Sequence, residues 1–273
     1  MVKKLFKHEF LSYARVMSVV YAILFTIAAA GRVIQFFESD SIPYKIINIV
    51  SLITYGVSVF ATVAFVFVMA ILRFYKNLFT AEGYLSFTLP VSPTQHIIVK
   101  VVTAACMEMV TVAAVLLSGC IISAGELLVE IWKALTYILE MLYELAGFQT
   151  VLIGSELALL FLLECFSGIL LYYTFIAIGQ LFKKNRILAA VGAYFVYYFI
   201  TQAVSTAFSV AFSLLAATDW FNSILVRFGN FVEVHPYITI HSGIGIMALL
   251  VAVFVVVEFI VVKKIITNKL NLE

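Results

Sequence analysis

The segment RFYKNLFTAEGYLSFTLPVSPTQHIIVK, residues 73–100, is the longest polar interruption between two very apolar stretches of this 273-residue chain. Its run Ser92-Pro93-Thr94-Gln95 has the residue types of a capping box, with Ser92 as N-cap, Pro93 at the first helical position and Gln95 at the third. We therefore expect the next helix to begin at about Pro93, well before the apolar run that follows it.

The composition is that of an integral membrane protein. Hydrophobic residues make up 64% of the chain, charged residues 12%, and the mean hydropathy is +1.12. A soluble domain is about half apolar and about one quarter charged. We therefore predict an all-α membrane protein with a single transmembrane domain over residues 1–273. Its expected spans, each long enough to cross a hydrocarbon core of about 30 Å, are residues 16–37, 46–72, 101–124, 157–182, 187–217 and 242–262.

The segment before the first span is basic and amphipathic. Residues 1–15 place apolar side chains at helical spacing opposite lysines, which predicts a helix lying in the membrane surface. The rival interpretation of the N-terminus is a cleaved signal peptide ending at Ala30. We favour an uncleaved span, because the apolar character continues to Phe37.

Residues 125–152 differ from the spans. Their polar side chains step by 4, 3, 4, 3 and 4 residues, which predicts one narrow polar stripe on an otherwise apolar helix. The stripe consists of Glu126, Glu130, Lys133, Tyr137, Glu140 and Glu144. Four carboxylates make spanning costly, so we expect a helix that lies on the membrane surface or on the rim of the bundle. Gly147 is its expected C-terminal stop, and residues 218–241 are expected to form a mixed loop.

Basic residues are concentrated on one side of the expected topology. Thirteen of the 17 Lys and Arg residues fall in the N-terminal segment, residues 73–100, the turn 183–186 and the tail 263–273. Six spans place both termini on the same side, and the positive-inside rule makes that side cytoplasmic. Residues 73–100 are then a cytoplasmic loop, and residues 125–152 are extracellular.

The sequence contains no catalytic or metal-binding motif. It lacks a GxxxxGK[ST] phosphate loop, so this chain is not expected to hydrolyse ATP by itself. Its four histidines are scattered, and its three cysteines lie in apolar runs without metal-ligand spacing. We therefore predict that the chain is no enzyme and has no cofactor, metal or nucleic-acid partner of its own.

Polar residues follow one face of the second and fifth spans. The stripe in the second span consists of Asn48, Ser51, Tyr55, Ser58 and Thr62. The stripe in the fifth span consists of Tyr194, Tyr198, Gln202, Ser205, Ser209 and Ser213. Polar side chains in a membrane face protein or water rather than lipid. Two interpretations are open: helix packing, which suits the small serines, and a pathway between subunits, which suits the bulky residues better.

Three carboxylates lie inside apolar runs, at Glu108, Glu164 and Glu258. An ionisable residue at membrane depth is a functional candidate by default. Glu258 stands five residues before Lys263, from where its side chain can extend to the interface. For Glu108 and Glu164 two interpretations are open: a proton or substrate site, and a neutral carboxylic acid bonded between helices.

Apolar and aromatic residues gather in the middle of residues 73–100. Such a patch in a loop generally marks a partner surface, although Tyr and Phe also suit the lipid interface. Thr80 can cap a short helix that includes Glu82, Gly83 weakens that helix, and Pro90 ends it. The residues expected to contact a partner are Thr80, Glu82, Gly83, Tyr84, Leu85, Phe87 and Pro90.

This segment resembles the cytoplasmic loop of type-2 ABC exporter permeases from Gram-positive bacteria. The resemblance includes its basic-aromatic start, the EGYLSFTLPVS core (residues 82–92) and the helix restart, and it extends to KKLFKHEF (3–10) and KLNLE (269–273). It implies a surface helix before six spans, with spans two and five lining the path. It also implies two partners: an ATPase subunit that carries ATP and Mg and docks on the 73–100 loop, and a second permease, identical or homologous.

The resemblance thus implies a permease subunit of an ATP-driven exporter in a bacterial plasma membrane. Its substrate would be amphipathic, such as a peptide, an antimicrobial or a lipid-like compound, and the turn 183–186 would be a lesser ATPase contact. The acidic helix of residues 125–152 departs from the compact members of this family. An alternative from another class is therefore a non-transporting sensor or immunity subunit that captures a cationic peptide through this helix.

Overall fold

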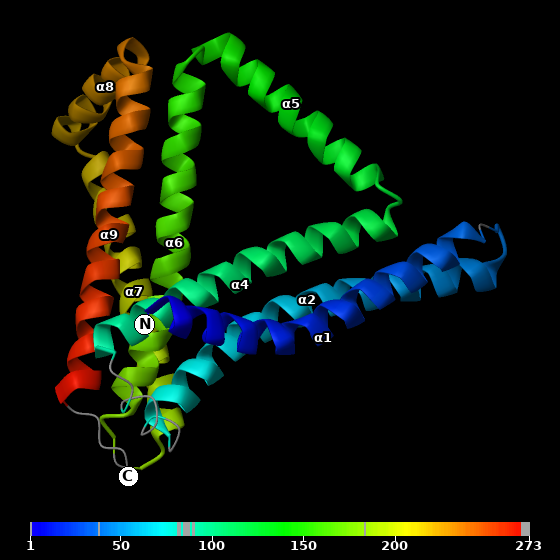
Figure 1. The fold of residues 1–273 in the computed structure, drawn as a ribbon. Coiled ribbons are helices and arrows are strands. Elements are labelled where there is room, and N and C mark those ends of the chain that lie inside the picture. Colours follow the sequence, from blue (N-terminus) through cyan, green and yellow to red (C-terminus); the bar gives the residue numbers. More distant parts are fainter. Residues whose placement is uncertain are drawn as a thin grey trace. The chain divides into compact units, whose positions relative to one another are not determined.

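The computed structural model describes residues 2–37, 39–80, 83, 88, 91–182 and 184–268. Over these residues the chain forms eight helices and no strand (Figure 1), which confirms the all-α prediction. Six helices are long and apolar enough to cross a membrane. They are α1 (Val2–Phe36), α2 (Ile42–Phe79), α4 (Pro93–Ile122), α6 (Gln149–Gly179), α7 (Arg186–Ala216) and α9 (Pro236–Asn268). The two others are α5 (Glu126–Ala146) and α8 (Asp219–Val234).

The chain divides into two compact units, the first with α1, α2, α4 and α5 and the second with α6 to α9. In the first unit α1, α2 and α4 run alongside one another (Figure 1). The core cluster of this unit contains Tyr13, Met17, Val66 and Met107. The Tyr13 hydroxyl donates to the Val66 carbonyl, and the Tyr21 and Thr111 hydroxyls lie 2.7 Å apart between α1 and α4. Polar contacts of this kind hold membrane helices together where hydrophobic burial cannot.

Two predicted helix ends are confirmed. Helix α4 begins at Pro93 behind a complete capping box, in which Gln95 N–H donates to Ser92 Oγ at 3.4 Å and Ser92 N–H donates to Gln95 Oε1 at 3.1 Å. Helix α5 ends at Ala146, and Gly147 has φ +54°, a conformation that glycine adopts without strain.

Replacing Ser92 by Ala is expected to destabilise the protein by about 1 kcal/mol, because the N-terminal amides of α4 lose their side-chain acceptor. Unfolding in detergent, titrated with SDS and followed by circular dichroism, measures this loss. Ser92→Asp keeps an oxygen in the cap and is the matched control. A Ser92→Ala variant as stable as the Ser92→Asp variant would show that the cap contributes nothing.

Several helices extend beyond the expected spans. Residues predicted as a surface helix and a first span form one continuous helix, α1. Helix α2 continues to Phe79, so the first seven residues of the predicted 73–100 loop are helical. The segment without an assigned helix bound is therefore only residues 80–92.

The prediction of a loop over residues 218–241 is wrong for most of these residues. Asp219–Val234 form α8, and α9 already begins at Pro236. Thr218 is the N-cap of α8, and its side chain accepts a hydrogen bond from Phe221 N–H at 3.4 Å. Asp219 in the first turn also favours a helix start, since a negative charge stabilises the N-terminal end of the helix dipole.

In the second unit, α6 packs against both α7 and α9, and α8 contacts α7 and α9. The ring of Phe175 on α6 lies 5.6 Å from that of Tyr194 and 5.4 Å from that of Tyr197, both on α7. Phe212 on α7 and Phe221 on α8 meet edge to face at 5.4 Å. Aromatic contacts thus join α7 to both of its neighbours.

Candidate functional site

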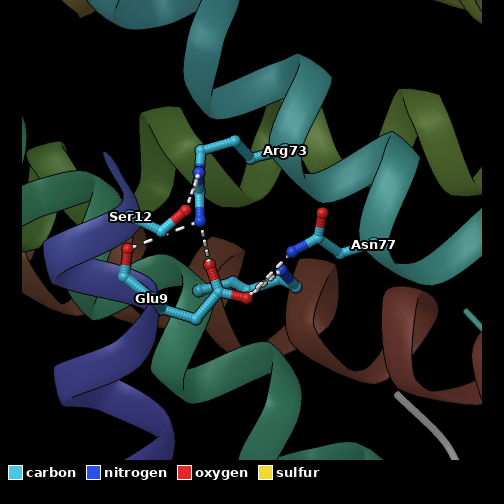
Figure 2. A network of polar contacts seen from close by, with 5 residues as sticks. Glu9, Ser12, Arg73 and Asn77 are labelled. Atoms are coloured by element: carbon cyan, nitrogen blue, oxygen red, sulfur yellow. Dashed lines mark hydrogen bonds and ion pairs between the residues drawn. The ribbon is translucent and has the colours of Figure 1, made fainter. Parts of the chain in front are cut away.

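One carboxylate joins the three core helices of the first unit. Glu9 of α1 is only 8% exposed and points toward α2 and α4 (Figure 2). Its Oε2 accepts from Arg73 Nη2 at 2.7 Å. Its Oε1 accepts from Lys100 Nζ at 2.8 Å and from Asn77 Nδ2 at 3.0 Å. We call Glu9, Ser12, Arg73, Asn77 and Lys100 the Glu9 cluster.

Arg73 is fixed from several sides. Besides the Glu9 carboxylate, its guanidinium donates to Ser12 Oγ at 3.1 Å and to the Glu9 backbone carbonyl at 3.4 Å (Figure 2). The guanidinium carbon also lies 5.4 Å from the centre of the Tyr13 ring, within the range of a cation–π contact. A planar group with several directed donors fixes orientation better than a lysine ammonium would.

The cluster brings the two ends of the 73–100 segment together. Arg73 stands on the last turns of α2 and Lys100 near the start of α4, and both bind the same carboxylate. Lys100 is only 6% exposed, and a buried ammonium is tolerated where a counter-charge pairs with it. Sequence reasoning used these two cations only to assign topology and overlooked Glu9. The available signal was a single carboxylate inside the basic opening KKLFKHEF.

Only part of the predicted partner surface lies within the described residues. Thr80 terminates α2, and its hydroxyl donates backward to the Lys76 carbonyl at 2.6 Å, so it does not act there as the cap of a following helix. Gly83 is buried, and its N–H donates to the Thr80 carbonyl at 2.8 Å. The remaining predicted contacts lie outside the described residues: Glu82, Tyr84, Leu85, Phe87 and Pro90.

The polar stripe of α2 faces α4 in its central part. The Tyr55 hydroxyl lies 2.9 Å from Ser118 Oγ on α4, and Thr62 is only 3% exposed. The Ser51, Ser58 and Thr62 hydroxyls each donate to a carbonyl of the preceding turn. At Tyr55 and Thr62 the stripe therefore contributes to helix packing within the first unit.

The polar stripe of α7 is placed differently. None of the residues of α7, all of which the structure describes, is buried. Tyr194 contacts Phe175 of α6 through its ring, whereas the rest of the stripe is exposed. These exposed residues are Tyr198, Gln202, Ser205, Ser209 and Ser213. The stripe of α7 is thus a surface feature of the second unit.

The carboxylates at membrane depth fall into two places. Glu108 on α4 is partly buried, and its Oε1 has no hydrogen-bond partner among the described residues. Glu164 on α6 and Glu258 on α9 line one cavity of the second unit. Glu258 is 8% exposed, so its carboxyl group lies inside this unit and does not extend along the helix toward Lys263.

His241 is a further polar contact of the second unit. Its Nδ1 lies 2.8 Å from the Glu156 carboxylate, and its Nε2 lies 2.9 Å from Gln149 Oε1, which joins α9 to the start of α6. Within the described part of the chain, no three His, Cys, Asp or Glu side chains are arranged to hold a metal ion.

Polar groups thus gather around Glu9, at the Tyr55–Ser118 contact, at His241 and in the cavity beside Glu258. Comparisons of the chain with protein-family models, with curated proteins and with solved structures found no match.

Proposed function

We propose that this chain is the permease subunit of an ATP-driven ABC exporter. Six long apolar helices, the one-sided distribution of Lys and Arg, and the resemblance of residues 82–92 to a permease coupling loop support the proposal. The chain would lie in a bacterial plasma membrane with both termini cytoplasmic. ATP and Mg would be bound by a separate ATPase subunit, and a second permease subunit, identical or homologous, would complete the path.

The observation that carries the proposal is the Glu9 cluster. The segment 80–92 joins α2 to α4, and the Glu9 carboxylate binds both of these helices next to that segment. A displacement of residues 80–92 is therefore passed to α1, α2 and α4 together instead of bending one helix. This is what a coupling loop must do when two ATPase subunits close around ATP and move it.

The lengths of the helices fit this arrangement. Helix α1 has 35 residues, and at 1.5 Å per residue it is about 50 Å long, well beyond a hydrocarbon core of about 30 Å. Its basic first turns, with Lys3, Lys4 and Lys7, would then lie at the cytoplasmic surface beside the Glu9 cluster. Helix α5, with its acidic stripe, would lie on the extracellular surface.

The path between two permease subunits would run along α7 and the parts of α2 that α4 does not cover. The exposed stripe of α7 offers tyrosines, a glutamine and serines at regular spacing. Few fixed charges and many aromatic hydroxyls suit an amphipathic substrate, such as a peptide, an antimicrobial or a lipid-like compound.

The proposal is tested by co-expressing the chain with the ATPase encoded beside it in its genome. We expect the two to co-purify in detergent and to hydrolyse ATP in proteoliposomes. The double variant Glu82→Lys, Leu85→Pro is expected to reduce ATPase association at least tenfold, since it reverses a charge and breaks the backbone in the predicted contact surface. Asp40→Lys, a charge reversal in the opposite loop, is the matched control and should keep association. If association and transport both survive the double substitution, residues 80–92 do not couple the two subunits.

A second candidate is a sensor or immunity subunit that captures a cationic peptide. One observation favours it: none of the residues of α5, which the structure describes completely, is buried, so its carboxylates are accessible. A particle that purifies without any ATPase and binds a cationic peptide at α5 would support this function over the exporter.

A further inference from the structure

The second unit contains a cavity of about 380 Å³ lined by α6, α7 and α9. Two carboxylates reach it from different helices, Glu164 from α6 and Glu258 from α9. Ser167 and Tyr197 add hydroxyl groups, and Met247 and Phe254 belong to its apolar wall. The volume falls in the range of sites that hold small organic ligands.

The cavity contains an unsatisfied acceptor. Glu258 is only 8% exposed, and its Oε2 has no hydrogen-bond partner among the described residues. Ser167 supplies one side-chain hydrogen bond to the same carboxyl group. Leaving a carboxyl oxygen buried without a partner costs about 1–3 kcal/mol, and more when the group is charged. A ligand that carries a positive charge into the cavity would remove this cost.

The lining restricts which ligand fits. No Lys, Arg or His is among the described residues that line the cavity, so nothing there neutralises the two carboxylates. Tyr197 and Phe254 offer ring faces, which attract cations. A hard metal ion such as Ca²⁺ requires six to eight oxygen ligands, which an apolar wall with two carboxylates and two hydroxyls does not provide. An organic cation needs only the charge and the apolar surface.

We propose that the cavity lined by Glu164 and Glu258 binds a monovalent organic cation with an apolar body. Glu258 neutralises the charge from inside the unit, and Glu164, which is exposed, meets the ligand at the accessible side of the cavity. Glu164 stands midway along α6, so the ligand is bound at the depth of the hydrocarbon core if α6 spans the membrane. The site belongs to this chain alone and goes beyond the proposed function, because binding requires neither an ATPase nor transport.

The experiment uses the full chain, purified in dodecyl maltoside, and radiolabelled tetraphenylphosphonium as the probe. Tetraphenylborate has the same shape and the opposite charge, so it controls for partition into apolar surface. We expect saturable binding of the cation, and no saturable binding of the borate. Glu258→Gln and Glu164→Gln are each expected to weaken the affinity for the cation at least tenfold, while Glu258→Asp should retain part of it.

Glu233→Gln removes an exposed carboxylate of α8 and is the matched control, expected to bind like the unmodified chain. A second measurement needs no variant: dicyclohexylcarbodiimide is expected to label Glu258, and tetraphenylphosphonium to protect it, as located by mass spectrometry. Absence of saturable cation binding, equal binding of cation and borate, or unchanged affinity in both Gln variants would overturn the proposal. Cation binding in a chain that associates with no ATPase would contradict only the exporter function.

Discussion

Replacing Glu9 by Gln is expected to lower the free energy of unfolding by about 3–5 kcal/mol, the usual cost of removing one partner from a buried ion pair. The change keeps the shape of the side chain and removes its charge. Lys100, whose side chain is 5% exposed, would then lie buried beside a neutral amide, and Arg73, at 17%, would lose its carboxylate. The cost comes from these two stranded cations more than from the lost hydrogen bonds.

A double variant separates charge from packing. In Glu9→Gln with Lys100→Met the most buried cation is removed together with the carboxylate, so part of the lost stability should return, as it does when apolar residues replace a whole buried pair. Unfolding in dodecyl maltoside titrated with SDS, followed by circular dichroism, measures all three proteins. Asp40→Asn breaks the exposed Asp40–Lys45 pair and is expected to leave the unfolding curve unchanged. A Glu9→Gln variant that unfolds with the unmodified chain would show that the cluster is not a structural tie.

The sequence predicted features that depend on neighbours in the chain. The capping box at Ser92 and the stop at Gly147 involve residues only a few positions apart, so their pattern can be read directly. The six apolar helices follow from composition, because a backbone in lipid must satisfy its own hydrogen bonds. Helix α8 was missed because its charged residues were interpreted as loop signals, although Thr218 and Asp219 form an ordinary helix start.

The candidate site could not be predicted in the same way. Glu9 binds Arg73 and Lys100, which are 64 and 91 residues away in the sequence, and no periodicity links positions on different helices. The same holds for Glu164 and Glu258, which the sequence marked as separate candidates and the fold places in one cavity. The cost of an ionisable residue at membrane depth identifies the residue, whereas only tertiary packing identifies its partner.

Gly179 is the position where a single added methyl group is expected to disturb the second unit most. A Cβ atom there would lie 2.6 Å from the Arg186 carbonyl oxygen and 2.7 Å from Ala190 Cβ. The first of these atoms belongs to the backbone of α7, so the clash is not relieved by turning a side chain. Helix α6 ends at Gly179 and α7 begins at Arg186, and this close approach lets the chain reverse over a short connection.

Gly179→Ala is therefore expected to destabilise the protein by about 1–3 kcal/mol, the range for overpacking a tight contact. Intrinsic helix propensity acts in the opposite direction, since Ala is favoured over Gly in a helix interior by about 1 kcal/mol. Gly154→Ala, on the same helix with nothing within 4 Å of the added methyl group, isolates that term and should be neutral or slightly stabilising. The SDS titration used for Glu9 compares the two variants. Equal stability of Gly179→Ala and Gly154→Ala would mean that α6 and α7 do not approach each other as closely as the structure places them.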